Sequence, residues 1–212
     1  MKSLRVFLGV FLFGSVLLVA GCNESSSSGY GAEHDFGDND PDVYLCFGDS
    51  LTEGFGGVTP YPSHLANFLA KPVVNEGRGG ERVGDGARRL GGVLDQHKPG
   101  YCLILQGVND IVHGGDPAYI AEQVRNMIQL AKVRNVLPAV STITPFVGNR
   151  EWYNEVVDAT NELIRAVAIE EGVLLVDCAR VIAGRRDYVL SDGLHFSESG
   201  SIAVAAAWSD RL

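Results

Sequence analysis

Four short peptides carry residues whose types and spacing could perform acyl-transfer chemistry. A serine stands in GDSLTEG at residues 48–54, and an aspartate and a histidine lie three residues apart in DGLH at residues 192–195. GRGG at 77–80 and GVND at 107–110 add backbone N–H groups and an amide side chain. Hydrolysis of an ester by a serine enzyme needs a nucleophile, a base, a carboxylate that orients the base, and donors for the developing oxyanion. The four peptides together contain all of these.

Ser50 lies where a predicted strand turns into a helix. Gly48 and Gly54 flank this turn, and glycine permits the sharp backbone path that would leave the Ser50 hydroxyl free. A serine in such a place can instead be a helix N-cap. The nucleophile motif G-x-S-x-G does not occur in the sequence, which argues against an α/β-hydrolase fold. Because a DGLH peptide follows downstream, we interpret Ser50 as the nucleophile.

His195 is the predicted base, and Asp192 is its predicted partner. A turn brings residues i and i+3 together, so the Asp192 carboxylate can accept the Nδ1 proton of His195 and leave Nε2 facing the serine. The alternative is a surface turn in which Asp192 caps the following helix, because Asp-Gly is a common turn dipeptide.

The four peptides, in this order and each beside a predicted strand end, resemble the SGNH (GDSL) hydrolase family. The segments GDSLTEGFGG, PYPSHLANFLA, VVNEGRGGERVGDG and GVNDIVHGG are most similar to its thioesterase I, lysophospholipase L1 and arylesterase group. The resemblance covers about residues 43–212, and DGLH stands just before the last predicted helix, as it does in the family. It implies a serine ester hydrolase that needs no cofactor.

The same resemblance assigns an oxyanion hole. In the family the donors are the N–H of the nucleophile, the N–H of a glycine in the second peptide and the side chain of an asparagine in the third. By motif these correspond to Ser50, Gly80 and Asn109. The choice of Gly80 follows from the register counted from Asn75, and a shift of one residue would select Gly79 instead.

The first residues predict export from the cytoplasm. Lys2 and Arg5 precede an almost entirely apolar run at 6–20, and the small residues of VAGC end at Cys22. This pattern resembles a bacterial lipoprotein signal, with residues 1–21 cleaved and a lipid attached to Cys22. An uncleaved membrane span is the alternative, but the apolar run is shorter than the roughly 20 residues that a bilayer needs.

Lipidated Cys22 would anchor the protein to a membrane of the bacterial cell envelope. Asn23 follows it, which in a Gram-negative cell favours the periplasmic side of the outer membrane. Residues 22–42 are rich in Ser, Gly and Asp and are typical of a flexible polar linker. Their aspartates lack the spacing of an EF-hand calcium loop. The hydrolase domain is predicted to be residues 43–212.

Apolar, β-branched runs alternate with amphipathic patterns along this domain. The predicted strands are 43–47, 73–75, 102–106, 136–143 and 173–176. The predicted helices are 62–70, 83–97, 117–134, 152–171 and 197–210. Such alternation predicts parallel strands with right-handed crossovers. The expected fold class is therefore α/β: a flavodoxin-like three-layer α/β/α sandwich around about five parallel strands, with reactive groups beyond their carboxyl ends.

Composition narrows the possible partners and cofactors. The chain has 212 residues, and its 17 Lys and Arg against 26 Asp and Glu form no basic cluster that could follow a phosphate backbone, so nucleic acid is not an expected partner. Cys46, Cys102 and Cys178 fall in or beside predicted core strands, where cysteine acts as a small hydrophobe. The sequence has no CxxC or HExxH, so it implies no metal and no cofactor. It identifies no protein partner.

The predicted function is hydrolysis of carboxylic or thio esters of small molecules. Two alternatives stay open: a carbohydrate O-acetyl esterase on the same machinery, and an envelope lipoprotein that binds without reacting. Arg78 and Arg82 either attract a carboxylate or phosphate of the substrate or are solvated. Phe146, Trp152 and Tyr153, on one loop after the fourth strand, either line an acyl groove or seat the following helix.

Overall fold

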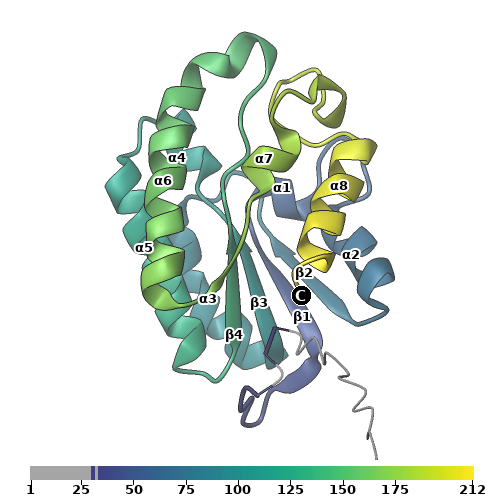
Figure 1. The fold of residues 1–212 in the computed structure, drawn as a ribbon, viewed down its shortest axis with the longest axis vertical. Coiled ribbons are helices and arrows are strands. Elements are labelled where there is room, and N and C mark those ends of the chain that lie inside the picture. Colours follow the sequence, from purple (N-terminus) through teal and green to yellow (C-terminus); the bar gives the residue numbers. More distant parts are fainter. Residues whose placement is uncertain (1–29, 32) are drawn as a thin grey trace, which may run out of the picture.

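The computed structural model describes residues 30–31 and 33–212. In that part of the chain, parallel strands form one sheet in the order β2-β1-β3-β4-β5 (Figure 1). The strands are β1 (Asp40–Gly48), β2 (Val73–Gly77), β3 (Pro99–Leu105), β4 (Leu137–Ser141) and β5 (Leu174–Val176). This order confirms the predicted flavodoxin-like sheet. From β1 the chain first adds β2 on one side and then crosses to β3 on the other side. Sheets of this kind bind ligands beyond the carboxyl ends of the two strands at this change of direction.

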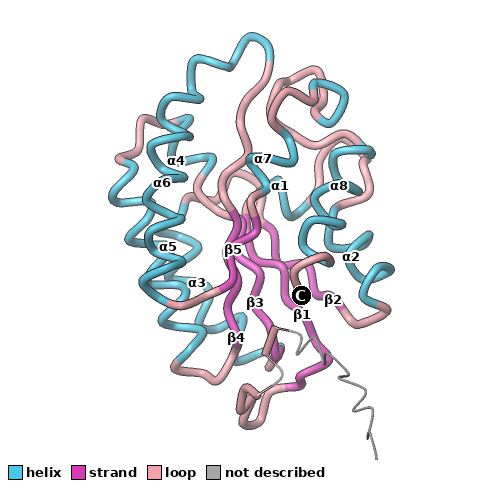
Figure 2. The backbone as a smooth tube through the Cα atoms, in the orientation of Figure 1, coloured by secondary structure: helices cyan, strands magenta, loops and turns pink. Residues whose placement is uncertain are grey.

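Helices cover both faces of the sheet and complete the predicted α/β/α sandwich, with the strands in magenta between cyan helices in Figure 2. The longer helices are α2 (Tyr61–Leu69), α3 (Val83–His97), α5 (Pro117–Lys132), α6 (Asn154–Glu171) and α8 (Glu198–Ser209). Helix α5 packs against α3 and α6 on one face, and α8 packs against α2 and α7 on the other.

Short helices follow the carboxyl ends of several strands. They are α1 (Ser50–Glu53), α4 (Val108–Val112) and α7 (Cys178–Ile182), and two 3-10 turns, η1 (Gly148–Tyr153) and η2 (Arg186–Tyr188), lie nearby in the chain. Sequence analysis did not predict these elements, because a single helical turn is too short to show a 3.6-residue period.

The core lies where the central strands have neighbours on both sides and helices on both faces. Every residue of β3 is buried, as expected for a central parallel strand. Cys46, Cys102 and Cys178 are buried free thiols. Burial raises the pKa of Cys102 and Cys178 to about 12, so these thiols stay protonated and unreactive at neutral pH.

The residues just before β1 pack against the amino ends of the strands. The Tyr30 hydroxyl donates to the Pro138 carbonyl oxygen at 2.7 Å, and the rings of Phe36 and Tyr101 lie 5.4 Å apart. The predicted linker at 22–42 is therefore too long, since its final part belongs to the folded domain. The composition of the segment did not predict this packing. Two aromatic side chains in a polar segment are enough to anchor the segment once the folded sheet provides apolar partners.

Cys22 and the predicted signal peptide at 1–21 lie outside the described residues. Within the described ranges, none of the helices combines the length and the apolar character needed to cross a bilayer.

Candidate active site

Ser50 is the first residue of α1, directly beyond the carboxyl end of β1. Asp49 is the N-cap of this helix and accepts the Leu51 N–H at 3.0 Å, so the alternative of Ser50 as the N-cap is wrong. A Cβ at Gly48 would lie 2.2 Å from the Leu105 carbonyl oxygen, so only glycine lets β1 end this close to β3. The Ser50 side chain is left free for another partner.

That partner is His195. Ser50 Oγ lies 2.9 Å from His195 Nε2, and His195 Nδ1 lies 2.6 Å from Asp192 Oδ2. Asp192 Oδ1 accepts the backbone N–H groups of Leu194 and His195 at 3.0 and 3.1 Å. Partial burial raises the pKa of the Asp192 carboxyl, but these hydrogen bonds outweigh burial and hold the pKa below its ordinary value. Asp192 is therefore an ionised acceptor at neutral pH.

The turn that carries Asp192 and His195 is held from two sides. Gly193 has a φ of +76°, and a Cβ there would lie 2.3 Å from the Val147 carbonyl oxygen, while the Val147 N–H donates to the Gly193 carbonyl at 3.0 Å. On the other side, the Phe55 ring stacks on the His195 imidazole with 3.8 Å between centroids. The imidazole is thus oriented by packing as well as by hydrogen bonds.

The D-x-x-H spacing by itself does not single out His195, because Asp110 also stands three residues before His113. Asp110 Oδ2 accepts the Val83 N–H at 2.8 Å, whereas His113 Nδ1 lies 2.6 Å from the Asn109 carbonyl oxygen. Asp110 and His113 therefore hydrogen-bond to different backbone groups and not to each other. The contact with Ser50 distinguishes the two histidines.

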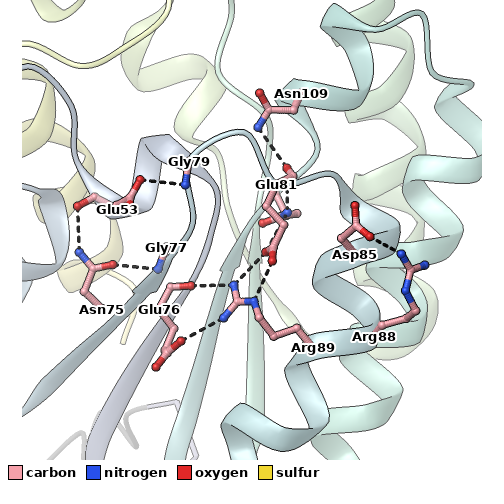
Figure 3. A network of polar contacts seen from close by, with 11 residues as sticks. Glu53, Asn75, Glu76, Gly77, Gly79, Glu81, Asp85, Arg88, Arg89 and Asn109 are labelled. Carbon is pink, nitrogen blue, oxygen red and sulfur yellow. Dashed lines mark hydrogen bonds and ion pairs between the residues drawn. The ribbon is translucent and has the colours of Figure 1, made fainter.

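The two other predicted residues lie on the loops after β2 and β3. Gly80 is exposed and has a φ of +74°. The neighbouring Gly79 N–H donates to Glu53 Oε2 at 2.8 Å (Figure 3), whereas the Gly80 N–H has no hydrogen-bond acceptor within residues 30–31 and 33–212. Of the two glycines, Gly80 is the one with an N–H available to a ligand.

Asn109 Nδ2 donates to the Glu81 carbonyl oxygen at 3.1 Å, which uses one of its two amide hydrogens (Figure 3). Glu81 is itself anchored, because Arg89 donates from two nitrogens to its carboxylate, both at 2.8 Å. The same guanidinium binds the Glu76 carboxylate at 3.0 Å and lies over the Phe47 ring. The Asn109 amide is therefore held through a network based on a largely buried arginine.

Three residues that sequence analysis did not single out contribute to the site: Asp49, Glu53 and Phe55. All belong to the GDSLTEGF peptide, so proximity to Ser50 in the chain was the available signal. Asp49 is the least expected, since burial raises the pKa of its carboxyl to about 7, against a smaller lowering by the Leu51 N–H. Its Oδ2 has no hydrogen-bond partner in the described part of the chain.

The aromatic residues of the loop after β4 differ in their surroundings, and the choice between an acyl groove and a seat for the helix stays a prediction. Phe146 is 1% exposed and lines a cavity of about 650 Å³ beyond β4 and β5. Trp152 is 69% exposed and stacks on Tyr153, with 3.5 Å between ring centroids. The hollow lined by Ser50 and His195 is far smaller, at about 10 Å³.

Comparison with known proteins identifies the family. Residues 46–201 match the GDSL-like lipase/acylhydrolase family. The chain belongs to this family and is an ester hydrolase of the SGNH type. This agrees with the resemblance carried by the four sequence motifs.

Individual relatives are similar over most of the domain. An arylesterase of Vibrio mimicus is 30% identical over 161 residues, which are 71% of this chain and 78% of that protein. The thioesterase 1/protease 1/lysophospholipase L1 of Escherichia coli strain K12 is 30% identical over 122 residues, which are 56% of this chain and 59% of that protein.

Solved structures show the same fold at lower sequence identity. The crystal structure of TesA has a TM-score of 0.72 and 23% identity, covering 80% of this chain and 97% of the other. A family 3 carbohydrate esterase of Clostridium thermocellum has a TM-score of 0.68 and 20% identity, covering 81% of this chain and 95% of the other.

Proposed function

We propose that this protein hydrolyses carboxylic or thio esters with Ser50, His195 and Asp192 as a catalytic triad. The proposal depends above all on the continuous hydrogen-bonded series from Ser50 Oγ through the His195 ring to Asp192, with distances of 2.9 and 2.6 Å. The arylesterase and thioesterase relatives support an ester or thioester as the substrate.

In the proposed reaction, Ser50 Oγ attacks the acyl carbon while His195 Nε2 takes its proton and then returns it to the leaving alcohol or thiol. Water, deprotonated by His195, next attacks the acyl carbon, and His195 returns the proton to Ser50 Oγ as the bond to Oγ breaks and the acid leaves. Asp192 keeps the Nδ1 proton in place and stabilises the imidazolium. The oxyanion accepts hydrogen bonds from the N–H groups of Ser50 and Gly80 and from the Asn109 side chain.

The test is Ser50→Ala, assayed on para-nitrophenyl butyrate. We expect turnover to fall by on the order of 10⁶-fold, as when a triad serine is removed. The melting temperature should stay within a few degrees, because a hydroxyl that bonds only to an imidazole contributes little to stability. Ser199→Ala, an exposed change on α8, is the matched control and should keep full activity. A folded Ser50→Ala protein with near-normal turnover would remove the proposal.

A second candidate is the removal of acetyl groups from carbohydrates with the same triad. The small hollow beside Ser50 and His195 favours it, because an acetyl group needs little space there. Comparing acetylated xylose with para-nitrophenyl butyrate tests this candidate. A higher kcat/KM for the sugar ester would favour it, and no turnover of the sugar ester would exclude it.

We also propose that the enzyme is lipid-anchored through Cys22 in the bacterial cell envelope, on the periplasmic side of the outer membrane in a Gram-negative cell. The support is the basic, apolar and VAGC pattern of residues 1–22. Cys22→Ala should leave the precursor uncleaved and without lipid in mass spectra of the full chain. Mature, unlipidated Cys22 in the natural protein would disprove the anchor.

A further inference from the structure

A cavity of about 650 Å³ lies beyond the carboxyl ends of β4 and β5, between α6 and α7. It is far larger than the hollow beside Ser50. Part of its wall is apolar, formed by Pro145, Phe146, Val147, Ala179 and Ala183. The rest is charged, and the charged residues decide what the cavity can bind.

Three arginines line this cavity, and they differ in how they are paired. Arg165 donates to the Asp177 carboxylate at 3.2 Å. Arg180 and Arg186 form no ion pair with any residue that the structure describes. Both guanidinium groups therefore keep donors that a ligand can use.

No carboxylate in the wall forms an ion pair with either of these two arginines. Asp177 is taken by Arg165, and Glu151 Oε1 accepts the Gly148 N–H at 2.8 Å. Asp158 is exposed, as are Arg180 and Arg186, and it forms no ion pair with any described residue. The three arginines and three carboxylates of the wall cancel in formal charge. The guanidinium groups of Arg180 and Arg186 nevertheless keep unpaired donors beside an apolar wall, and an anionic, partly apolar ligand can use both features.

The cavity adjoins the turn that carries the catalytic Asp192. Val147, which lines the cavity, contacts Gly193, the next residue after Asp192. The Val147 N–H donates to the Gly193 carbonyl oxygen at 3.0 Å, and a Cβ at Gly193 would lie 2.3 Å from the Val147 carbonyl oxygen. The guanidinium of Arg186 lies over Gly148, because a Cβ there would be 2.7 Å from one of its nitrogens. A ligand in the cavity is thus next to the loop that forms part of the active site, at the same edge of the sheet.

We propose that this cavity binds an anionic end group of the substrate, a carboxylate or a phosphate, through Arg180 and Arg186. The proposal rests on the proposed function, since it concerns the part of an ester that extends away from Ser50. The apolar wall receives the hydrocarbon between the ester and the anionic group. The preferred substrates are then esters with a charged end rather than neutral fatty esters.

The experiment compares two esters that differ only at the far end of the acyl chain, para-nitrophenyl hexanoate and mono-para-nitrophenyl adipate. The natural enzyme should have the higher kcat/KM for the adipate ester. Arg180→Ala and Arg186→Ala should each lower that kcat/KM roughly tenfold or more, the loss expected for a hydrogen bond to a charged group. Hydrolysis of the neutral hexanoate ester should not change.

Two control variants test whether the effect is specific to the arginines that line the cavity. Arg150→Ala removes an exposed arginine of η1 that does not line the cavity, and it should leave both esters unaffected. Arg78→Ala tests the arginine beside Gly79 in the same way. If Arg78→Ala, rather than Arg180→Ala or Arg186→Ala, abolishes the preference for adipate, the cavity proposal is wrong. Equal losses on both esters in the Arg180 and Arg186 variants would also overturn it.

A binding measurement keeps this proposal independent of the catalytic one. In the Ser50→Ala protein, calorimetry should detect adipate monoester or hexyl phosphate, and adding Arg180→Ala should weaken the Kd roughly tenfold. Tighter binding of one of these two probes identifies the anion as carboxylate or phosphate. Binding that ignores Arg180→Ala, or no binding of either probe, would overturn the cavity proposal even if the triad is correct. If binding is found but neither ester is hydrolysed by the natural enzyme, the proposed function fails instead.

Discussion

The candidate active site has two sides, the proposed triad and the proposed oxyanion hole, and they differ in how directly their functional groups are held. On the triad side, each side chain bonds to the next, and Asp192 Oδ1 also ties down its own turn. On the oxyanion side, Asn109 is held through the Glu81 backbone, and the peptide before Gly80 is held through the Glu53 side chain. The proposed triad is positioned by its own members, whereas the proposed donors Gly80 and Asn109 are positioned by residues outside the proposed reaction.

This difference has a topological origin. Asp192 and His195 share one turn, so only Ser50 must be brought to them from β1. The proposed oxyanion donors come from the segments after three different strands, and no short segment of sequence can fix their relative positions. We therefore expect changes in the triad to act on the reaction directly, and changes around the oxyanion hole to act through neighbours and by smaller factors.

After Ser50→Ala, the largest effect is expected from Asp192→Asn, which tests whether the triad depends on its internal contacts. The neutral amide cannot stabilise the imidazolium, and its NH₂ group can donate to Nδ1 and so favour the wrong His195 tautomer, so kcat should fall on the order of 10⁴-fold. Initial rates on para-nitrophenyl butyrate measure this. Asp187→Asn, an exposed change just before this turn, serves as the control. A loss of less than tenfold would mean that Phe55 packing alone orients His195.

On the oxyanion side, Asn109→Ala should lower kcat by about 10²–10³-fold with little change in KM, because its amide is needed mainly in the transition state. Asn67→Ala, exposed on α2, should have no effect. Equal effects of Asn109→Ala on KM and on kcat would place Asn109 in ground-state binding instead.

Glu53→Ala tests the indirect support of the proposed oxyanion hole. Without the Glu53 carboxylate, the Gly79 N–H loses its acceptor and the Gly80 N–H loses its fixed direction, so kcat should fall roughly tenfold, about the value of one hydrogen bond to a charged group. Glu53→Gln retains an acceptor oxygen and should restore most of the rate at an unchanged KM. If Gln behaves like Ala, the charge of Glu53 matters rather than its position.

The last prediction concerns Asp49, next to Ser50 in the chain, and it is on stability rather than on the rate. Burial raises the pKa of Asp49 to about 7, so the folded state keeps a proton that the unfolded state releases near pH 4. Its stabilising contribution is complete below the unfolded pKa and is lost as pH rises to about 7, by up to about 1.4 kcal/mol per pH unit. Asp49→Asn should remove this dependence.

Urea unfolding at about pH 5 and about pH 8 measures how the free energy of unfolding depends on Asp49. The natural protein should lose stability relative to Asp49→Asn between these two values. Asp38→Asn, an exposed change, should follow the natural protein. Parallel pH profiles for the natural and Asp49→Asn proteins would show that Asp49 is already ionised in the fold.

The sequence was sufficient to predict the long helices and strands and to locate the motifs in order along the chain. The longer helices and the parallel strands have local signals, since amphipathic periods and β-branched runs lie within one segment. The segment Val83–His97 forms the helix predicted for it. The identities of Ser50, Asp192 and His195 as candidates were likewise readable from short motifs, because the two last residues share a single turn.

Only the tertiary structure decided the rest. It separated His195 from His113 after an identical spacing, enclosed Asp49, and placed Phe55 on the imidazole. It also folded residues as early as Tyr30 onto the sheet. In each case the deciding neighbour is distant in the sequence or depends on how neighbouring strands end. Such contacts arise from packing between segments, which the local pattern of either segment does not contain.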